Sequence, residues 1–324
     1  MSAAATAGRG TSSPQPHVGV LEPFTRHRRF NSPISRDLLM DAETRDIGRD
    51  IANCASRLAI RIEFDQDEEA KALLKGTRAC NRRLCPFCEW RRTRAWRKRL
   101  YSGLDAFYAD YPTYRGLFLT LTVRNVPLED LGETLTDMNR AWQRFKAASF
   151  FPTPYWFRRT EVTVGHGAQN PRPMAHPHFH ALLLVRPSYF SREYVKQLEW
   201  QKQWQMAARL DYTPIVDVRA AKPNSTSGGS GTSACKEAVL EAAKYAAKAT
   251  QLMELGPAIT ELHWQTKGKR LYSLSRPLSK YIQSGEVTAE EMTDAADINS
   301  ASPVALEGVA SWFEDSQEYL FTSL

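Results

Sequence analysis

The sequence has no uninterrupted apolar run of about 18 residues, the length that a membrane-spanning helix needs. Its first residues, MSAAATAGRGTSSPQPHVG, lack the apolar core of a secretory signal peptide. We therefore expect a cytoplasmic protein that has no membrane partner.

Basic residues are missing from the C-terminal end, because no Lys or Arg follows Lys280 whereas nine acidic residues do. Since the whole chain carries a net charge of +7, the residues up to Lys280 carry +16. A basic body favours a polyanionic partner, although solvated basic faces are also common. We interpret the acidic tail as a solubilising extension; the alternative is a mimic of nucleic acid that restrains the basic body.

The hydrophobic periodicity predicts an α+β fold. Strand patterns occur at 117–123, 155–164, 178–185, 214–220 and 270–275, and helical patterns at 128–148, 191–210 and 235–252, with Ser191 as an N-cap. Their order predicts a sheet with helices packed on one side.

Composition divides the chain into four parts. Residues 1–45 are rich in Ala, Thr, Ser, Pro, Gly and Arg without periodicity, so we predict that they are largely disordered. A cysteine-bearing basic module follows at 46–100, then the main domain at 101–285 and the acidic tail at 286–324.

Cysteine is scarce, with five residues in the chain, yet four of them form a C-x25-C-x4-C-x2-C pattern. In a reducing compartment this pattern favours thiolates on a metal over disulfides. Four sulfur ligands suit a closed, tetrahedral, structural zinc site. The ligands would be Cys54, Cys80, Cys85 and Cys88, and the alternative is a group of buried thiols without a metal.

The segment around these cysteines is densely basic: nine basic residues lie between Arg78 and Arg99, with Glu89 as the single acid. Trp90 and Trp96 alternate with the arginines, which would combine phosphate contacts with stacking surfaces. The alternative is a solvated basic helix whose tryptophans point into the core. The candidate DNA-binding residues are Arg82, Arg83, Arg91, Arg92, Arg94 and Arg97.

Three of the seven histidines, His176, His178 and His180, occupy alternate positions in HPHFHALLLV. Because side chains of a strand alternate between its faces, the three imidazoles share one side. Glu161 lies in a second strand that otherwise reads as buried, where a lone carboxylate is costly unless it is paired or coordinated. Two imidazoles and a carboxylate would bind a divalent ion that polarises a phosphate oxygen, unless the histidines merely face solvent.

The stretch EAAKYAAK places Glu241, Tyr245 and Lys248 on one face of a predicted helix. A phenolic nucleophile, a carboxylate that handles a proton and a cation for phosphate charge are the groups that phosphodiester transfer needs. Alone the pattern is weak, because such residues usually form a solvated face; it gains weight beside the histidine strand.

Four blocks in order make the chain resemble a HUH endonuclease, specifically a single-tyrosine plasmid rolling-circle replication initiator. They are CNRRLCPFCEWRRTRAW, FLTLTV, HPHFHALL and EAAKYAAK, and the resemblance covers about residues 50–280. It implies a central antiparallel sheet that carries the histidines, with the tyrosine on a helix alongside. The loop STSGGSGTS before that helix and the acidic tail depart from the family pattern.

The resemblance also implies roles. His178 and His180 would bind Mg²⁺ or Mn²⁺ with Glu161 as third ligand, and His176 would be a helper beside them. Tyr245 would attack the scissile phosphate and become joined to its 5′ side, freeing a 3′ hydroxyl for a host polymerase. Glu241 would activate water at termination, and Lys248 would steady phosphate charge.

The partners implied are plasmid origin DNA, a host helicase and a host DNA polymerase. Two other interpretations fit the same residues: a non-catalytic, zinc-dependent DNA-binding regulator and a HUH transposase. The first requires that the histidines be structural, and the second requires end-specific strand transfer within a mobile element.

Overall fold

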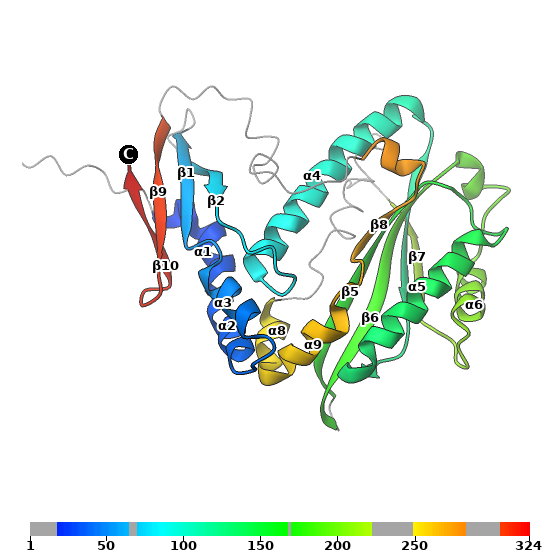
Figure 1. Ribbon diagram of the computed structural model, residues 1–324. Coiled ribbons are helices and arrows are strands. Elements are labelled where there is room, and N and C mark those ends of the chain that lie inside the picture. The colour runs from blue at the N-terminus through cyan, green and yellow to red at the C-terminus, as the bar shows by residue number, and fades with distance from the viewer. Residues whose placement is uncertain (1–17, 65–69, 168–169, 222–248, 283–304) are drawn as a thin grey trace, which may run out of the picture.

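The computed structural model describes residues 18–64, 70–167, 170–221, 249–282 and 305–324, and it contains two antiparallel sheets joined by a long helix (Figure 1). The helices are α1 Glu22–Arg29, α2 Asn31–Leu39, α3 Arg45–Asn53, α4 Pro86–Asp110, α5 Leu131–Ala147, α6 Gln197–Ala208, α8 Ala249–Glu254 and α9 Ile259–Thr266. The strands are β1 Arg57–Phe64, β2 Ala70–Thr77, β3 Arg115–Thr122, β4 Val126–Pro127, β5 Trp156–Gly167, β6 Asn170–Val185, β7 Val216–Ala220, β8 Tyr272–Leu274, β9 Ala305–Phe313 and β10 Glu318–Ser323. The predicted α+β class with antiparallel sheets and flanking helices is confirmed.

The larger sheet has the strand order β7-β3-β6-β5-β8, and β4 pairs with β6. Its central strand β6 is apolar from Ala181 to Val185 and runs antiparallel to both β3 and β5. The strands predicted at 117–123, 155–164, 178–185, 214–220 and 270–275 are all present. The helix predicted at 128–148 is also present, as α5 preceded by a short 3-10 turn at Leu128–Asp130.

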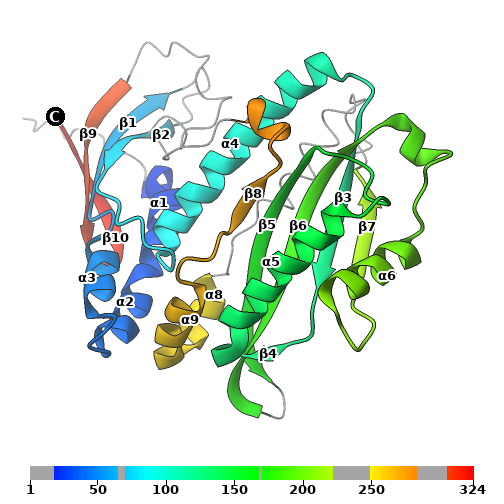
Figure 2. The same cartoon turned by 45° about the vertical axis from the view of Figure 1, so that its right-hand side comes forward.

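Helices cover both faces of this sheet, so the prediction that they pack on one side is wrong (Figure 2). Alternation along β6 explains the difference, because Phe179 and Leu183 face α5 and α6 whereas Leu182 and Leu184 face α4. Both sets of residues are buried, which requires a cover on each side. The helix predicted at 191–210 begins only at Gln197, with Lys196 rather than Ser191 at its N-cap position.

The smaller sheet, of order β10-β9-β1-β2, packs with α1, α2 and α3 in a separate core. The prediction that residues 1–45 are disordered is therefore wrong for residues 18–45, and residues 1–17 lie outside the described part of the chain. Apolar side chains of this region, Leu21, Phe24, Ile34 and Leu38, are buried against the start of α4 and the small sheet. Their long-range partners, rather than local periodicity, hold these short helices in place.

The end of the acidic tail is structured as well, which corrects its interpretation as a solubilising extension for residues 305–324. Strand β9 pairs with β1 along its length, and β10 completes a hairpin with β9. Acidic side chains of the hairpin meet the basic helix α1, with Glu318 at 3.6 Å from Arg29 and Glu314 at 3.9 Å from Arg28. Part of the acidic charge after Lys280 thus serves an internal contact with α1.

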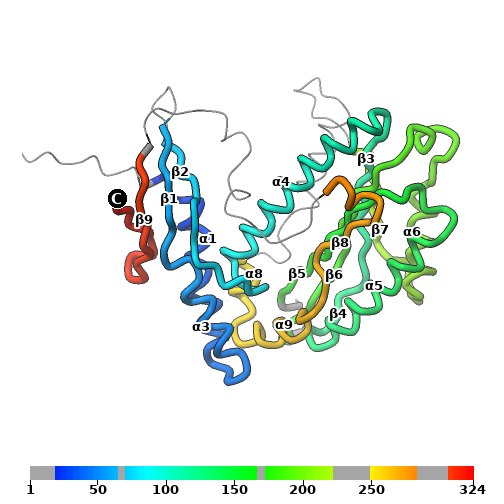
Figure 3. Tube along the Cα trace, turned by 45° about the horizontal axis from the view of Figure 1, so that its top comes forward, coloured from blue at the N-terminus to red at the C-terminus, as the bar shows by residue number. Residues whose placement is uncertain are grey.

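Helix α4 links the two sheets, and Figure 3 shows it running between them. Its first turns belong to the core of the small sheet, through Phe87 and Trp90, and its later turns, through Leu104 and Phe107, pack on the large sheet. The boundary predicted at residue 100 falls inside this continuous helix. Among the described residues, no helix is long and apolar enough to cross a membrane.

Candidate active site and metal centres

Strands β5 and β6 bring Glu161, His178 and His180 together on the face of the large sheet that α4 covers. Glu161 lies directly opposite His178 in the antiparallel register, and His180 is two residues further along the same face. This cross-strand pairing is the closest approach that two strands allow between side chains. The alternation predicted from the sequence places His178 and His180 on one face, and the register of β5 places Glu161 on that same face.

The three side chains point their ligand atoms at one another. The Nε2 atom of His180 is 3.1 Å from the Glu161 carboxylate, and Nε2 of His178 is 3.6 Å from the same oxygen. The ligand atoms of all three lie within 4.8 Å of one another. Two imidazole nitrogens and a carboxylate oxygen fit a divalent metal ion that retains open positions.

Each histidine uses its other ring nitrogen to fix its orientation. Nδ1 of His180 is 3.1 Å from the Thr120 hydroxyl, and Nδ1 of His178 is 3.2 Å from the backbone oxygen of His176. A carbonyl can only accept, so Nδ1 of His178 carries a proton. Without an ion, Nε2 can be protonated and donate to Glu161; with a bound cation, Nε2 would lose that proton and offer its lone pair. Thr120 was not recognised from the sequence, although its alternation with apolar residues in LFLTLTV put it on the same face.

Glu161 is held as a carboxylate. Its burial alone would raise its pKa, but hydrogen bonds from His178 and His180, with their charges, outweigh this effect and hold the pKa well below its usual range. A buried anion beside two imidazoles is a suitable electrostatic environment for a bound cation. The buried carboxylate suspected from the sequence is thus 8 % exposed and paired with both histidines.

His176 lies further from this centre. Its ring centroid is 5.4 Å from that of His178, and its backbone oxygen, rather than its imidazole, contacts the His178 ring. Burial, then the neighbouring His178, lowers its pKa. Its predicted role as a helper remains a prediction.

Three predicted residues, Glu241, Tyr245 and Lys248, lie outside the described residues, as does most of the helix predicted at 235–252. The described helix α8 begins at Ala249, directly after Lys248, and packs against β5, the strand that carries Glu161. Leu252 of α8 and Val162 of β5 belong to the same core. The roles of the three residues stay predictions.

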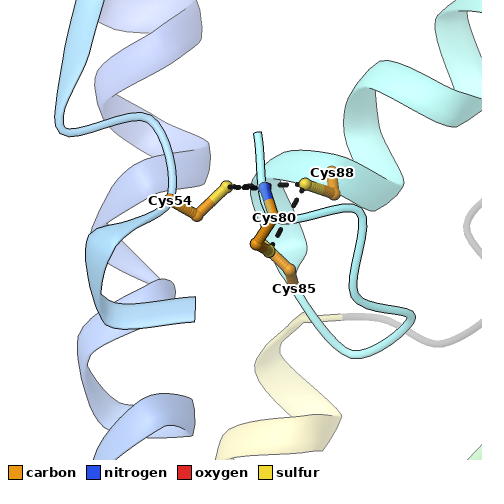
Figure 4. A group of neighbouring side chains, drawn as sticks. All are labelled: Cys54, Cys80, Cys85 and Cys88. Atoms are coloured by element: carbon orange, nitrogen blue, oxygen red, sulfur yellow. Dashed lines mark hydrogen bonds between the residues drawn. The ribbon is translucent and has the colours of Figure 1, made fainter. Parts of the chain in front are cut away.

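The four cysteines of the pattern converge from three segments, as Figure 4 shows. Cys54 follows α3, Cys80 follows β2, and Cys85 and Cys88 lie at the start of α4. The Cys88 sulfur is 3.4 Å from that of Cys54 and 3.7 Å from that of Cys80, and all four sulfurs lie within 4.8 Å of one another. A set of four sulfurs at one point suits a tetrahedral metal ion.

The thiols differ in their readiness to lose a proton. Burial raises the pKa of Cys85, whereas hydrogen bonds from Cys54, Cys80 and Cys85 lower the pKa of Cys88 well below its usual range. The hydrogen bonds among the sulfurs therefore favour a thiolate at Cys88, in the first turn of α4. Such a buried anion needs a cation beside it, which supports a metal over a group of free thiols.

The six arginines proposed for DNA contact differ in exposure. Arg82 is exposed and forms an ion pair with Asp50, whereas Arg83 donates to the backbone oxygen of Lys269 and Arg92 pairs with Glu89. Arg91 is buried, and Arg94 and Arg97 are partly exposed. Their assignment to DNA stays a prediction.

The two tryptophans of this segment pack internally. Trp90 is 6 % exposed and packs edge-on against Phe24, and Trp96 stacks on Tyr272 at a ring-centroid distance of 4.9 Å. Trp90 therefore points into the core, as in the alternative in which the tryptophans of this basic helix are buried.

Comparison with known proteins identifies relatives over most of the chain. The profile of a family described as replication protein matches residues 71–320. A protein rep of Lentilactobacillus hilgardii is 33% identical over 271 residues, which cover 80% of this chain and 83% of that protein. A protein rep of Streptococcus pneumoniae is 31% identical over 80% of each chain. No solved structure gives a significant match.

Proposed function

We propose that this chain starts replication by nicking one DNA strand at the plasmid origin. The premise is that the chain belongs to the replication protein family and is a plasmid replication initiator of the HUH superfamily. The nick would produce a covalent 5′-phosphotyrosyl intermediate and a free 3′ hydroxyl as primer. The membership of the family agrees with the resemblance drawn from the sequence motifs.

The observation that carries this proposal is the convergence of Glu161, His178 and His180 within 4.8 Å. A metal ion bound there, Mg²⁺ or Mn²⁺ in the proposal, would withdraw charge from the scissile phosphate. The three side chains hold and orient the ligand set, and Thr120 fixes the His180 ring. An open site of this kind suits phosphodiester chemistry better than a closed thiolate site does.

The proposed nucleophile is the phenolic oxygen of Tyr245. This oxygen would form a bond to the scissile phosphorus while the bond from phosphorus to the 3′ oxygen breaks. The phenol loses one proton and the departing 3′ oxygen gains one, so the step balances. Lys248 would neutralise phosphate charge, and Glu241 would activate water when termination is hydrolytic. Because α8 packs against β5, the chain following Lys248 returns to the strand of Glu161.

The nucleophile is tested by a covalent adduct. Wild-type protein incubated with Mn²⁺ and a single-stranded oligonucleotide from the origin hairpin of its own plasmid should give an adduct that survives denaturing electrophoresis. Tyr245→Phe should give none, whereas Tyr194→Phe, which alters an exposed tyrosine, should react as the wild type does. An undiminished adduct with Tyr245→Phe would refute the assignment.

We also propose a structural zinc ion on Cys54, Cys80, Cys85 and Cys88. The proposal rests on four converging sulfurs and on a thiolate at Cys88 that needs a cation. Elemental analysis should find one zinc per chain in the wild type and in Cys235→Ser, and less than a tenth of that in Cys88→Ser. Equal zinc in both variants would exclude this ligand set.

The two metal sites should respond differently to a chelator. Brief treatment with EDTA should abolish nicking, and Mn²⁺ should restore it while the zinc content stays constant, because a closed thiolate site exchanges slowly. Loss of zinc in step with loss of nicking would contradict the division into two sites. Origin DNA, a host helicase and a host polymerase are the partners that this function requires.

A further inference from the structure

A second concave site lies on the opposite face of the large sheet from the metal ligands. It is a cavity of about 810 Å³ between α5, the start of β5 and the segment on either side of β8. The described residues that line it include six cationic side chains and no carboxylate. These are Arg140, Lys146, Arg158, Lys269, Arg270 and Arg276.

Arg158 is the unusual member of this set. It is 2 % exposed, and its guanidinium lies 3.9 Å from the Phe179 ring centroid and 5.4 Å from that of Trp142. One nitrogen, Nη2, donates to Asn139 at 2.7 Å and to Ser273 at 3.3 Å. The other two, Nε and Nη1, are buried without a hydrogen-bond partner in the described structure.

Apart from Asn139 and Ser273, which both accept from Nη2, the described surroundings of Arg158 offer no hydrogen-bond acceptor to Nε and Nη1. The indole nitrogen of Trp142, which also lines the cavity, is likewise buried without a partner among the described residues. Burial, then the charge of Arg270, lowers the pKa of Arg158 to about 9. A buried arginine normally has a carboxylate beside it, and here the neighbouring charge has the same sign.

The contrast with Arg159, the next residue, is informative. Arg159 is fully buried on the other face of the sheet, and its Nη2 donates to the Glu89 carboxylate at 3.0 Å. Its Nε and Nη1 are also without a hydrogen-bond partner in the described structure, so the carboxylate is what distinguishes it from Arg158. Among the described residues, Glu89 is the internal anion for Arg159, and no carboxylate is paired with Arg158. The missing acceptor for Arg158 would have to come from outside the described part of the chain, and a bound anion would supply it.

We propose that this cavity is a phosphate-binding site, with Arg158 at its floor and Lys269, Arg270 and Arg276 at its rim. Phosphate oxygens accept hydrogen bonds from arginine in a geometry that few other ligands match. A cavity of this size holds more than a single phosphate group. The phosphate could belong to a free nucleotide or to a strand of DNA that passes over this face, away from the metal ligands.

The rim variants test the site without disturbing the core, because Arg270 and Arg276 are exposed. Pyrophosphate should raise the melting temperature of the wild type, and the double variant Arg270→Gln/Arg276→Gln should bind it at least tenfold more weakly. Arg192→Gln, which alters an arginine outside the cavity with an 83 % exposed side chain, should match the wild type. Equal pyrophosphate affinity in the double variant and the wild type would overturn the proposal.

The source of the phosphate follows from two further titrations, of ATP and of a fluorescent (dT)12 strand. If the double variant Arg270→Gln/Arg276→Gln binds ATP at least tenfold more weakly than the wild type does, the cavity is a nucleotide site. If it binds the (dT)12 strand at least tenfold more weakly, the cavity is a second DNA contact. Unchanged affinity for both would overturn the proposal. These measurements detect binding, so a failed adduct at Tyr245 would leave their outcome unaffected.

Arg158→Met separates binding from a purely structural role. If the guanidinium awaits an anion, the variant should lose the stabilisation by pyrophosphate yet melt at the same or a higher temperature without it, because a buried unpaired charge has been removed. A much lower melting temperature without pyrophosphate would instead show that Arg158 supports the core, and would remove it from the site.

Discussion

His180 shows how one side chain divides its two nitrogens between structure and chemistry. Its Nε2 faces Glu161 at 3.1 Å, and its Nδ1 lies 3.1 Å from Thr120 on the neighbouring strand β3. The second contact fixes the plane of the ring, so the direction of Nε2 does not depend on a bound ion. The precision of the ligand set thus depends on a residue that touches no ion.

Replacing Thr120 by valine tests that dependence. Because valine keeps the shape of threonine but has no hydroxyl, we expect Thr120→Val to fold normally and to bind Mn²⁺ about 10- to 100-fold more weakly. An electron paramagnetic resonance titration of free Mn²⁺ measures the affinity. Thr134→Val, on α5 away from the site, is the matched control, and equal affinities in the two variants would deny Thr120 its positioning role.

For single residues, the sequence was sufficient to predict that Glu161, His178 and His180 lie together, but not to predict the residue that orients His180. Alternation put His178 and His180 on one face, and the cost of a lone buried carboxylate singled out Glu161. Thr120 was missed because its proximity to His180 depends on the register between β3 and β6, which no local pattern specifies.

Among the elements, helix α1 is attached to α4 by a stacked pair that contains a titratable ring. His27 stacks on Trp90 with a ring-centroid distance of 4.9 Å and an interplanar angle of 20°. Burial, followed by the charges of Arg26 and Arg94, lowers the pKa of His27 to about 4. The attachment of α1 should therefore weaken in acid.

The direction of the change in stability with pH follows from the proton binding of the folded and unfolded chains. Between about pH 6.5, the ordinary pKa of histidine, and pH 4, the unfolded chain binds a proton that the folded chain does not, so stability falls as the pH falls. His27→Phe keeps the stacked ring but cannot titrate. We therefore compare the free energy of unfolding of His27→Phe with that of the wild type at two pH values. The advantage of the variant should be about 1–2 kcal/mol larger at pH 4 than at pH 7.5, a figure that is lowered because the His27 ring is partly exposed.

Urea unfolding at both pH values measures this difference, with the pH 7.5 comparison as the internal control. A constant offset between the variant and the wild type would mean that His27 does not titrate in this window. If the cysteines hold a metal, its release in acid would act on both proteins, so the comparison between the two proteins is the quantity to read.

The elements that the sequence predicted well are those with a strong local period, such as β3, β6 and α5. Helix α1 and the β9–β10 hairpin were missed because neither is stable alone: the hairpin pairs with β1, and α1 packs against β10 and α4. Their charges were visible as a basic body and an acidic tail, but charge gives no register. The second helical layer had a signal in the sequence, because the continuous apolar run Ala181–Val185 in β6 is typical of a strand that is buried on both faces. The order of the predicted elements did not show which helix covers the second face.

At the scale of the whole molecule, a single carboxylate connects the cysteine centre to the strand of the candidate active site. Glu89 follows Cys88 in α4, and it accepts hydrogen bonds from Arg92 and from Arg159, which lies two residues before Glu161 on β5. Glu89 is 5 % exposed and Arg159 is fully buried. The ion pair therefore fixes α4 and its cysteines against the large sheet.

Glu89→Gln should weaken this link because it leaves the buried charge of Arg159 without its counter-ion. We expect a loss of about 3–5 kcal/mol in the free energy of unfolding, measured by urea denaturation. The double variant Glu89→Met/Arg159→Met should recover most of this loss, since apolar side chains of similar length remove both charges together. If the double variant is no more stable than Glu89→Gln, the energy of this link lies in packing rather than in the ion pair, and the two sheets are joined by the apolar face of α4.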